Sequence, residues 1–466
     1  MKIKYTGKLT AIAIVVLIMS SCKVTQQYKQ PSVKTDSLYR SANTTDTSSM
    51  ANIPYTQMFK DANLQAMLQE AVSNNSDLKV AVGRIKEAEA NLRQSKAAFL
   101  PTFSVEPQYT KQKVAASQGG SLGIFPSNNY EISGTASWEA DIWGKLKSAK
   151  KAALASLLQS DAYKRSVQTQ LISDVVTDYY SLLAYDKQLA ITIQTVANRK
   201  EDVETNKALK LANINNANEA SVAQSEANRY AAEVTIPDLQ NNIRETENAI
   251  CVLLGRQPGS IQRDSLDRQQ ADTSLETGLP AQLLSNRPDV QEAEFNLRYY
   301  FEQINTARAY FYPSLSITAQ GGWQSATVGA LFNTASLFGN ITAGLTQPIF
   351  NHGLNKQRLA LAKAQYEENL ATFQQKVLTA GQEVSNALYS YQSAENKATI
   401  RSLQLDASKR AVDYNRELLK NGYATYTDVL TSEQNYLTAQ LNSVNDRLQQ
   451  LTAIVSLYRS LGGGWK

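Results

Sequence analysis

The chain is poor in the residues that usually carry out catalysis or hold a metal. Among its 466 residues are one histidine and two cysteines. Without a second histidine or a cysteine cluster, the sequence has no spacing of zinc ligands. No glycine-rich phosphate loop follows a predicted strand, which argues against an ATPase. We therefore expect no enzyme, no catalytic residue, no metal site and no cofactor.

Proline and glycine are also scarce, at 11 and 21 residues, which favours long helices. The formal net charge is only +5. Lysines and arginines are interspersed with acidic residues and form no run of five, so a nucleic-acid partner is not expected.

No apolar run near the N-terminus is long enough to cross a bilayer. Lys2, Lys4 and Lys8 precede the apolar run Ala11–Met19, which falls well short of the ~20 residues that a transmembrane helix needs. Residues 1–21 are therefore predicted to be a secretion signal. Its ending, MSSC, resembles a bacterial lipoprotein box, which would make Cys22 the lipid anchor of an N-terminal extension over 22–61. The residue after it, Lys23, favours the outer membrane. The alternative is a plain secretory signal with an incidental cysteine, and Cys251 is interpreted as a packed core thiol.

The sequence repeats itself at an offset near 210 residues. AAFLPTFS at 97–104 matches AYFYPSLS at 309–316, and Glu219-Ala220 matches Asp428-Val429. A nearly constant offset indicates an internal duplication. We predict repeats over 62–255 and 281–466, joined by a linker over 256–280 that is rich in Gly, Pro, Asp and Ser.

Each repeat contains two stretches in which apolar and polar residues alternate. We expect strands at about 101–112, 129–143, 313–324 and 339–350. Strands of about ten residues with one apolar face are what an outer-membrane β-barrel requires. A soluble hairpin with one buried face is the alternative. Four strands cannot close a barrel, and an open edge is not tolerated in lipid, so membrane strands would require oligomerisation.

Long helices are expected to occupy most of the remaining sequence. No proline interrupts 144–212 or 353–421, and each stretch would be ~100 Å long. A seven-residue apolar repeat predicts a coiled-coil seam, which includes Val175, Leu182, Leu189, Val196 and Val203. Shorter helices are expected at 62–98, 219–254, 281–311 and 428–461. Pro237 interrupts one of them, and we expect a kink there.

Three further stretches carry a resemblance to a known family. LLSNRPDVQEAEFNLR at 283–298, SLYRSLGGGW at 456–465 and LLGRQP at 253–258 are similar to stretches of the TolC-type outer membrane factors, specifically the lipoprotein branch (NodT/OprM-like) of resistance-nodulation-division (RND) efflux systems. The resemblance covers about 23–466. It implies a mainly α fold with a membrane β-barrel, in which three copies form one 12-stranded barrel and a long periplasmic coiled-coil α-barrel. It also implies an outer-membrane lipoprotein whose partners are a periplasmic adaptor protein and an inner-membrane RND transporter.

The function implied is an exit channel that passively conducts drugs, toxic compounds or metals out of the periplasm. A duct for type I protein secretion is the nearer alternative, and a lipid-anchored coiled-coil spacer the farther one. Alternating strands argue against the spacer, which has no need of them. The sequence does not identify the substrate.

The turns at 213–218 and 421–427 are expected to form the periplasmic tip. By resemblance, Asn213, Asn216, Gly422 and Thr425 would dock the adaptor, and the gate would comprise Asp428, Glu219, Tyr423 and Tyr426. A ring of carboxylates would favour cations at the constriction. Alternatively, both acids simply stabilise helix N-termini. Ala424 and Thr431 stand where related chains often have an arginine and a second acid, so packing of the two tyrosines would hold the tip closed.

Overall fold

The computed structural model describes residues 24–35, 38–40, 48–111, 128–214, 217–270 and 276–466. Outside the described residues lie the predicted secretion signal over 1–21, Cys22, Asn216 and residues 113–127 between the first two expected strands. The chain forms two compact units. Unit 1 comprises Met1–Ser32, Arg84–Ser160 and Glu292–Phe373; unit 2 comprises Val33–Gly83, Asp161–Gln291 and Gln374–Lys466.

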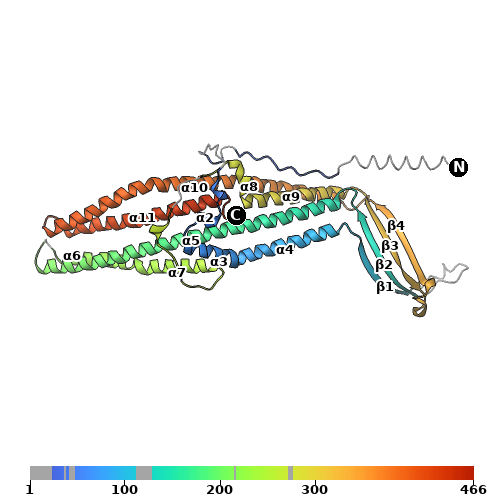
Figure 1. Cartoon of the computed structure of the whole chain (residues 1–466), viewed down its shortest axis with the longest axis horizontal. Coiled ribbons are helices and arrows are strands. Elements are labelled where there is room, and N and C mark those ends of the chain that lie inside the picture. Colours follow the sequence, from blue (N-terminus) through green and yellow to red (C-terminus); the bar gives the residue numbers. More distant parts are fainter. Residues whose placement is uncertain (1–23, 36–37, 41–47, 112–127, 215–216, 271–275) are drawn as a thin grey trace. The chain divides into compact units, whose positions relative to one another are not determined.

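Unit 1 contains one four-stranded antiparallel sheet, in the order β1-β2-β3-β4 (Figure 1). The strands are β1 (Thr102–Lys111), β2 (Asn128–Ala140), β3 (Ser314–Ser325) and β4 (Leu337–Thr346). The central pair, β2 and β3, joins the two sequence repeats, with Ala136 opposite Ala319. The last strand ends earlier than the expected 350, because Pro348 lacks the N–H that a further ladder bond would need.

The register brings the apolar residues of all four strands to one face of the sheet. Phe103 pairs with Ala136, Ala136 with Ala319, and Ala319 with Ile341. The side chains of Phe103 and Ile341 are 78% and 79% exposed in the single chain. The opposite face is polar, and there Gln320 donates to Glu131 and Ser133 at 3.2 and 3.1 Å. The sheet therefore presents one broad apolar face without a partner from the described part of the chain.

The helices match the expected pattern of two long and several shorter elements. The long ones are α5 (Lys145–Leu211) and α10 (Leu354–Lys420). The others are α2 (Tyr55–Met58), α3 (Ala62–Asn74), α4 (Ser76–Ala97), α6 (Glu219–Glu233), α7 (Thr235–Leu253), α8 (Leu283–Asn286), α9 (Pro288–Ala309) and α11 (Tyr426–Ser460). Single 3-10 turns lie at Met50–Asn52, Leu266–Arg268, Pro280–Gln282, Val328–Ala330 and Thr334–Ser336. Within the described residues, none of the helices combines the length and the apolar character needed to span a bilayer.

Two segments that were expected to be continuous helices are broken, each for a local reason. Pro237 would place its ring against the carbonyl of the residue four positions earlier, and α6 ends at that residue, Glu233. The expected kink is therefore a break between α6 and α7. The second break is at Asn75, whose side chain accepts hydrogen bonds from the N–H groups of Asp77 and Leu78 and so starts a new helix.

The predicted coiled-coil seam is buried in unit 2. Val175, Leu182 and Val203 are at most 1% exposed, as are Val377 and Val384 on α10. Cys251 is also buried and free, as expected of a packed thiol. The core of this unit thus follows the seven-residue repeat of the sequence.

Two of the stretches that suggested the family contact each other in unit 2. Arg287 binds Asp289 through two hydrogen bonds of 2.9 and 2.7 Å and also donates to the carbonyl of Ser460. Trp465 donates its indole N–H to the carbonyl of Asn286 at 3.1 Å. The contacts of Asn286 and Arg287 with Trp465 and Ser460 therefore form one junction within unit 2.

Candidate gate at the turns between long and short helices

Both long helices end in the same kind of turn, at the same end of unit 2 (Figure 1). After α5, Ile214 donates its N–H to the carbonyl of Leu209, and after α10, Tyr423 donates to Leu418. The residues between have left-handed backbone: Asn213 with φ 55° and Gly422 with φ 78°. These are the hydrogen bonds and the residue types of the Schellman motif, in which Gly or Asn tolerates the positive φ. Asn213 and Gly422 thus shape the two turns.

Thr425 and Asp428 form a reciprocal capping box at the start of α11. The side chain of Thr425 accepts from the N–H of Asp428, and Asp428 Oδ2 accepts from the backbone N–H of Thr425 at 2.8 Å. A second hydrogen bond, from the Thr425 hydroxyl, is 2.6 Å long. Hydrogen bonds from Thr425 lower the pKa of Asp428, so its carboxylate stays charged. Asp428 is exposed and also caps α11, so it can stabilise the helix N-terminus and still contribute its charge to a carboxylate ring.

The turn after α5 is longer, which changes the correspondence between the repeats. Asn218 caps α6 five positions after Asn213, whereas Thr425 caps α11 three positions after Gly422. By cap position, the counterpart of Asp428 is Ser221, although the sequence offset suggested Glu219. Glu219 lies in the first turn of α6 and forms an exposed ion pair with Lys210.

The two candidate gate tyrosines lie in different environments. Tyr426 is 9% exposed and packs with Leu419, Val429 and Leu430. Tyr423 is 83% exposed, and Leu211 and Ile214 on the other turn are 86% and 50% exposed. In the single chain, Tyr426 contributes to the packing of the tip, whereas Tyr423 presents an apolar ring at its surface.

A buried arginine close to the tip was missed by the sequence analysis. Arg199 on α5 is 4% exposed, donates to the carbonyl of Asn228 on α6, and donates to Gln434 on α11 at 2.8 Å. Its spacing from the apolar seam residues of α5 could have identified it. Val196, Arg199 and Val203 continue the buried 3-4 pattern, so Arg199 occupies a seam position. A polar residue in such a seam typically specifies how the helices pair.

Next to Arg199 lies a partly buried carboxylate pair, Asp202 and Glu433, that the sequence analysis also missed. Arg416 on α10 binds Glu433 on α11 at 2.9 and 2.6 Å and lies 3.8 Å from Asp202 on α5. Burial, and after it the neighbouring charge of Glu433, raise the pKa of Asp202 to about 7 against the opposing effect of Arg416. Three helices thus meet at one arginine and two acids, one of which titrates near neutral pH.

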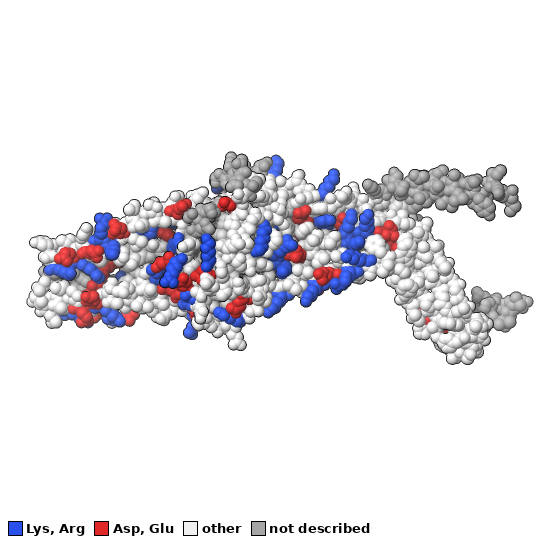
Figure 2. Space-filling model, viewed as in Figure 1, with Lys and Arg blue, Asp and Glu red and all other residues white. Residues whose placement is uncertain are grey.

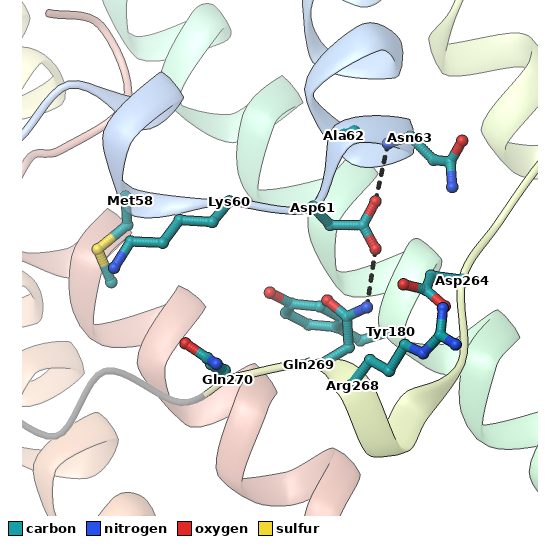
Figure 3. Close-up of a pocket in the computed structure, with 10 residues that line it drawn as sticks. All are labelled: Met58, Lys60, Asp61, Ala62, Asn63, Tyr180, Asp264, Arg268, Gln269 and Gln270. Carbon is teal, nitrogen blue, oxygen red and sulfur yellow. Dashed lines mark hydrogen bonds and ion pairs between the residues drawn. The ribbon is translucent and has the colours of Figure 1, made fainter.

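Unit 2 also contains a polar cavity of about 460 Å³, whose central carboxylate has a structural role (Figure 3). Asp61 projects into it but is fully engaged. It accepts from the N–H groups of Asn63 and Leu64, from Tyr179 and from Gln269, at distances of 2.7–3.1 Å. Asp61 therefore caps α3 and anchors the linker segment around Gln269, and no side chain there is poised for chemistry.

The described residues also contain no group of three His, Cys, Asp or Glu side chains that could hold a metal. His352 lies in the turn before α10, with φ 53°, and its ring contacts Phe350. His352 therefore lies at the boundary between the strand region and α10.

Comparisons with known proteins assign this fold to a class of outer-membrane channel. A family model described as outer membrane efflux protein matches residues 67–256 and 279–463. The chain belongs to this family. It is the outer-membrane exit channel of a tripartite efflux pump and not an enzyme.

The chain is similar to curated relatives over nearly its whole length. It is 29% identical to a probable efflux pump outer membrane protein, TtgC of Pseudomonas putida, covering 99% of this chain and 96% of that protein. It is 27% identical to the cation efflux system protein CusC of Escherichia coli, covering 97% and 98%. The outer-membrane channel OprN shares the fold, with a TM-score of 0.87 and 24% identity over 95% of this chain and 100% of OprN.

Proposed function

We propose that three copies of the chain close one 12-stranded barrel, and that each copy is held to the membrane by a lipid on Cys22. The observation that supports this proposal is the sheet itself. It has two edges, β1 and β4, and an exposed apolar face. Unpaired edges are not tolerated in lipid, so β1 of one copy would pair with β4 of the next. Pro107 in β1 has no backbone N–H, so β1 donates no ladder hydrogen bond at that position.

The turns after α5 and α10 form the periplasmic tip, where a periplasmic adaptor protein docks. The exposed apolar side chains of Leu211, Ile214 and Tyr423 supply contact area there. Asn213, Gly422 and Thr425 set the backbone of the docking turns, and Asn216 would be a further adaptor contact. The adaptor connects the channel to an inner-membrane RND transporter, which supplies the energy that a passive channel lacks.

The tip is also the gate. Asp428 and Glu219 from each of three copies would surround the constriction, where their charges favour cations. Packing of Tyr426, with Tyr423 contributing across subunits, holds the tip narrow. Arg416, bound to Glu433 and close to Asp202, holds α10 and α11 against α5 and resists opening.

Bilayer recordings in a KCl gradient test the gate assignment. The double variant Asp428→Ala with Glu219→Ala should shift the reversal potential towards lower cation preference. The control is Glu395→Ala, because Glu395 is exposed on α10 and forms no ion pair within the described residues. Unchanged selectivity in the double variant would remove these acids from the constriction.

The efflux reading is preferred to protein secretion because the curated relatives are named for efflux of cations, solvents and other small compounds. Deleting the gene and profiling sensitivity to drugs, bile salts and metals would identify the substrate class. Loss of a secreted protein with no change in sensitivity would favour the secretion duct.

A further inference from the structure

In unit 1, aromatic side chains gather where the sheet meets the helices. Trp143 stacks against Tyr312 with ring centroids 4.9 Å apart and donates to the carbonyl of Pro313 at 2.7 Å. Tyr310 and Tyr312 are 38% and 39% exposed, and Phe350 is 79% exposed. Partly exposed aromatic residues that border an apolar sheet face mark the boundary between hydrocarbon and headgroups.

Basic side chains occupy the helix ends immediately beyond these aromatics (Figure 2). In this region the acids are already engaged. Glu139 pairs with Lys145, Glu302 pairs with Lys151, and Asp141 accepts from the N–H groups at the start of α5. Six further cations form no ion pair within the described residues: Lys96, Lys147, Lys150, Arg308, Lys356 and Arg358. The helix ends next to the membrane boundary therefore carry uncompensated positive charge.

Helix stability does not explain four of these cations. Lys96 and Arg308 lie in the last turns of α4 and α9, where the helix dipole favours positive charge. Lys147 and Lys150 lie near the start of α5, however, and Lys356 and Arg358 near the start of α10. The dipole disfavours cations in the first turn, where Lys147 and Lys356 lie, whereas Lys150 and Arg358 lie in the second turn. An anion bound from outside the chain would offset this cost.

The cations of the two long helices lie around one shared aromatic ring. Tyr310 has Lys145 of α5 at 5.4 Å and Arg358 of α10 at 4.5 Å from its ring centroid. The carbonyl of Tyr310 accepts from Asn355 at 2.7 Å, which fixes the start of α10 beside it. Lys147, Lys150 and Lys356 lie in the first two turns of the same two helices and are exposed, and Lys150 lies 5.9 Å from the ring centroid of Phe99. The arrangement is a basic surface that borders an aromatic and apolar one.

We propose that Lys147, Lys150, Lys356 and Arg358 bind the phosphates of anionic phospholipids in the periplasm-facing leaflet of the outer membrane. The site rests on the outer-membrane location of the channel. Lysine and arginine next to an interfacial aromatic belt attract anionic headgroups through their charge, and the aromatic rings fix the depth of insertion. Bound headgroups would also neutralise the cations at the starts of α5 and α10, which removes the unfavourable interaction with the helix dipole.

The test uses the purified full-length channel in bilayers that contain brominated lipids. Quenching of tryptophan fluorescence by brominated phosphatidylglycerol relative to brominated phosphatidylcholine gives the relative affinity of each lipid, and Trp143 lies within this belt. Wild type should prefer phosphatidylglycerol by about threefold or more at low salt, and high salt should reduce the preference. The variant Lys147→Gln with Lys150→Gln and Lys356→Gln should bring the ratio close to one.

The matched control replaces three exposed lysines elsewhere, Lys86, Lys200 and Lys409, with glutamine and should retain the wild-type ratio. Channel conductance should persist in both variants, so loss of lipid preference is distinguishable from loss of the channel. If the triple variant does not assemble, Lys150→Gln alone should lower the ratio partially. A wild-type ratio near one would overturn the proposal. So would an unchanged ratio in the triple variant accompanied by a shifted reversal potential, because the cations would then line the conduit.

Discussion

At the residue scale, glycines and polar residues in tightly packed positions account for much of the architecture. Gly462 shows this at the C-terminal junction. Its φ is 92°, and an added Cβ would lie 2.6 Å from the carbonyl carbon of Asn286 and 2.9 Å from the amide nitrogen of Arg287. Backbone atoms cannot move aside as a flexible side chain can. Only glycine fits there, which gives the GGGW stretch a physical reason.

Gly462→Ala should therefore destabilise the channel by about 2–4 kcal/mol, through strain at positive φ and overpacking. The unfolding temperature of the detergent-solubilised channel would report it. Gly83→Ala is the control, because nothing lies within 4 Å of its added Cβ and it lies within α4. That change should be neutral or stabilise by up to ~1 kcal/mol. Equal effects of the two substitutions would refute the packing argument.

Asp202 should make stability depend on pH. Burial raises its folded pKa to about 7, above the unfolded value of 3.8, so the folded chain binds the extra proton between these limits. The contribution of protonated Asp202 to the free energy of unfolding is then fully present below about pH 4 and is lost as the pH rises through about 7. Arg199, Arg416, Glu433, Glu201 and Tyr426 are the charged and titratable groups around it.

Asp202→Asn should flatten this dependence and stabilise the channel at pH 8 relative to wild type. Unfolding temperatures measured from pH 4 to 8 would show it. The control is Asp413→Asn. Asp413 is an exposed carboxylate on α10 and lines the same groove as Arg416. An unaltered slope in the Asp202 variant would mean that this carboxyl is not the titrating group.

At the element scale, the sequence predicts the helices well because their signals are local and strong. The seven-residue repeat and the lack of proline together predict α5 and α10 to within one residue at each end. Pro237 likewise marks the interruption of its helix, although the sequence predicted a kink and the structure has a break between α6 and α7. The break at Asn75 was missed, because it depends on which hydrogen bonds one amide side chain makes, and a mid-helix asparagine could equally point to solvent.

The gate is less predictable than the helices, because it depends on cap register and on long-range pairing. The offset of the repeats placed Glu219 opposite Asp428, but two extra residues in the first turn place Ser221 there. Arg416, Glu433 and Asp202 are distributed over three helices, and no sequence spacing brings them together. Only the packing of those helices makes them neighbours.

The capping box of α11 provides a test that separates its structural role from its charge. Thr425→Ala removes the side-chain cap and leaves Asp428 charged, which should cost about 0.5–2 kcal/mol at the start of the helix. Hydrogen exchange over residues 427–430 should accelerate. The control is Thr372→Ala, because Thr372 only bonds the carbonyl of Glu368 in mid-helix. Unchanged exchange after Thr425→Ala would show that the cap is not formed in solution.

The pairing of α10 with α11 at the tip has its own test. Arg416→Gln removes the ion pair with Glu433 and its attraction to Asp202, so the tip should open more readily and bilayer conductance should rise several-fold. Arg410→Gln is the control, because Arg410 forms only an exposed ion pair with Asp406 in the same helix. If both variants conduct like wild type, the buried cluster does not restrain the gate.

At the scale of the whole molecule, a single chain is incomplete. Its sheet has two edges, and its apolar face is covered by nothing within the described residues. In water such a surface would aggregate, and in lipid its edges would be unsatisfied. Closure by further copies resolves both problems, because each added copy pairs an edge and presents its apolar face to lipid. The efflux conduit is then a property of the assembly.

Native mass spectrometry of the mature channel released from a mild detergent tests this account most directly. We expect one dominant species that contains three chains, with lipid retained on the complex. A dominant single chain that remains folded and soluble once detergent is removed would contradict a barrel shared between subunits, and with it the conduit.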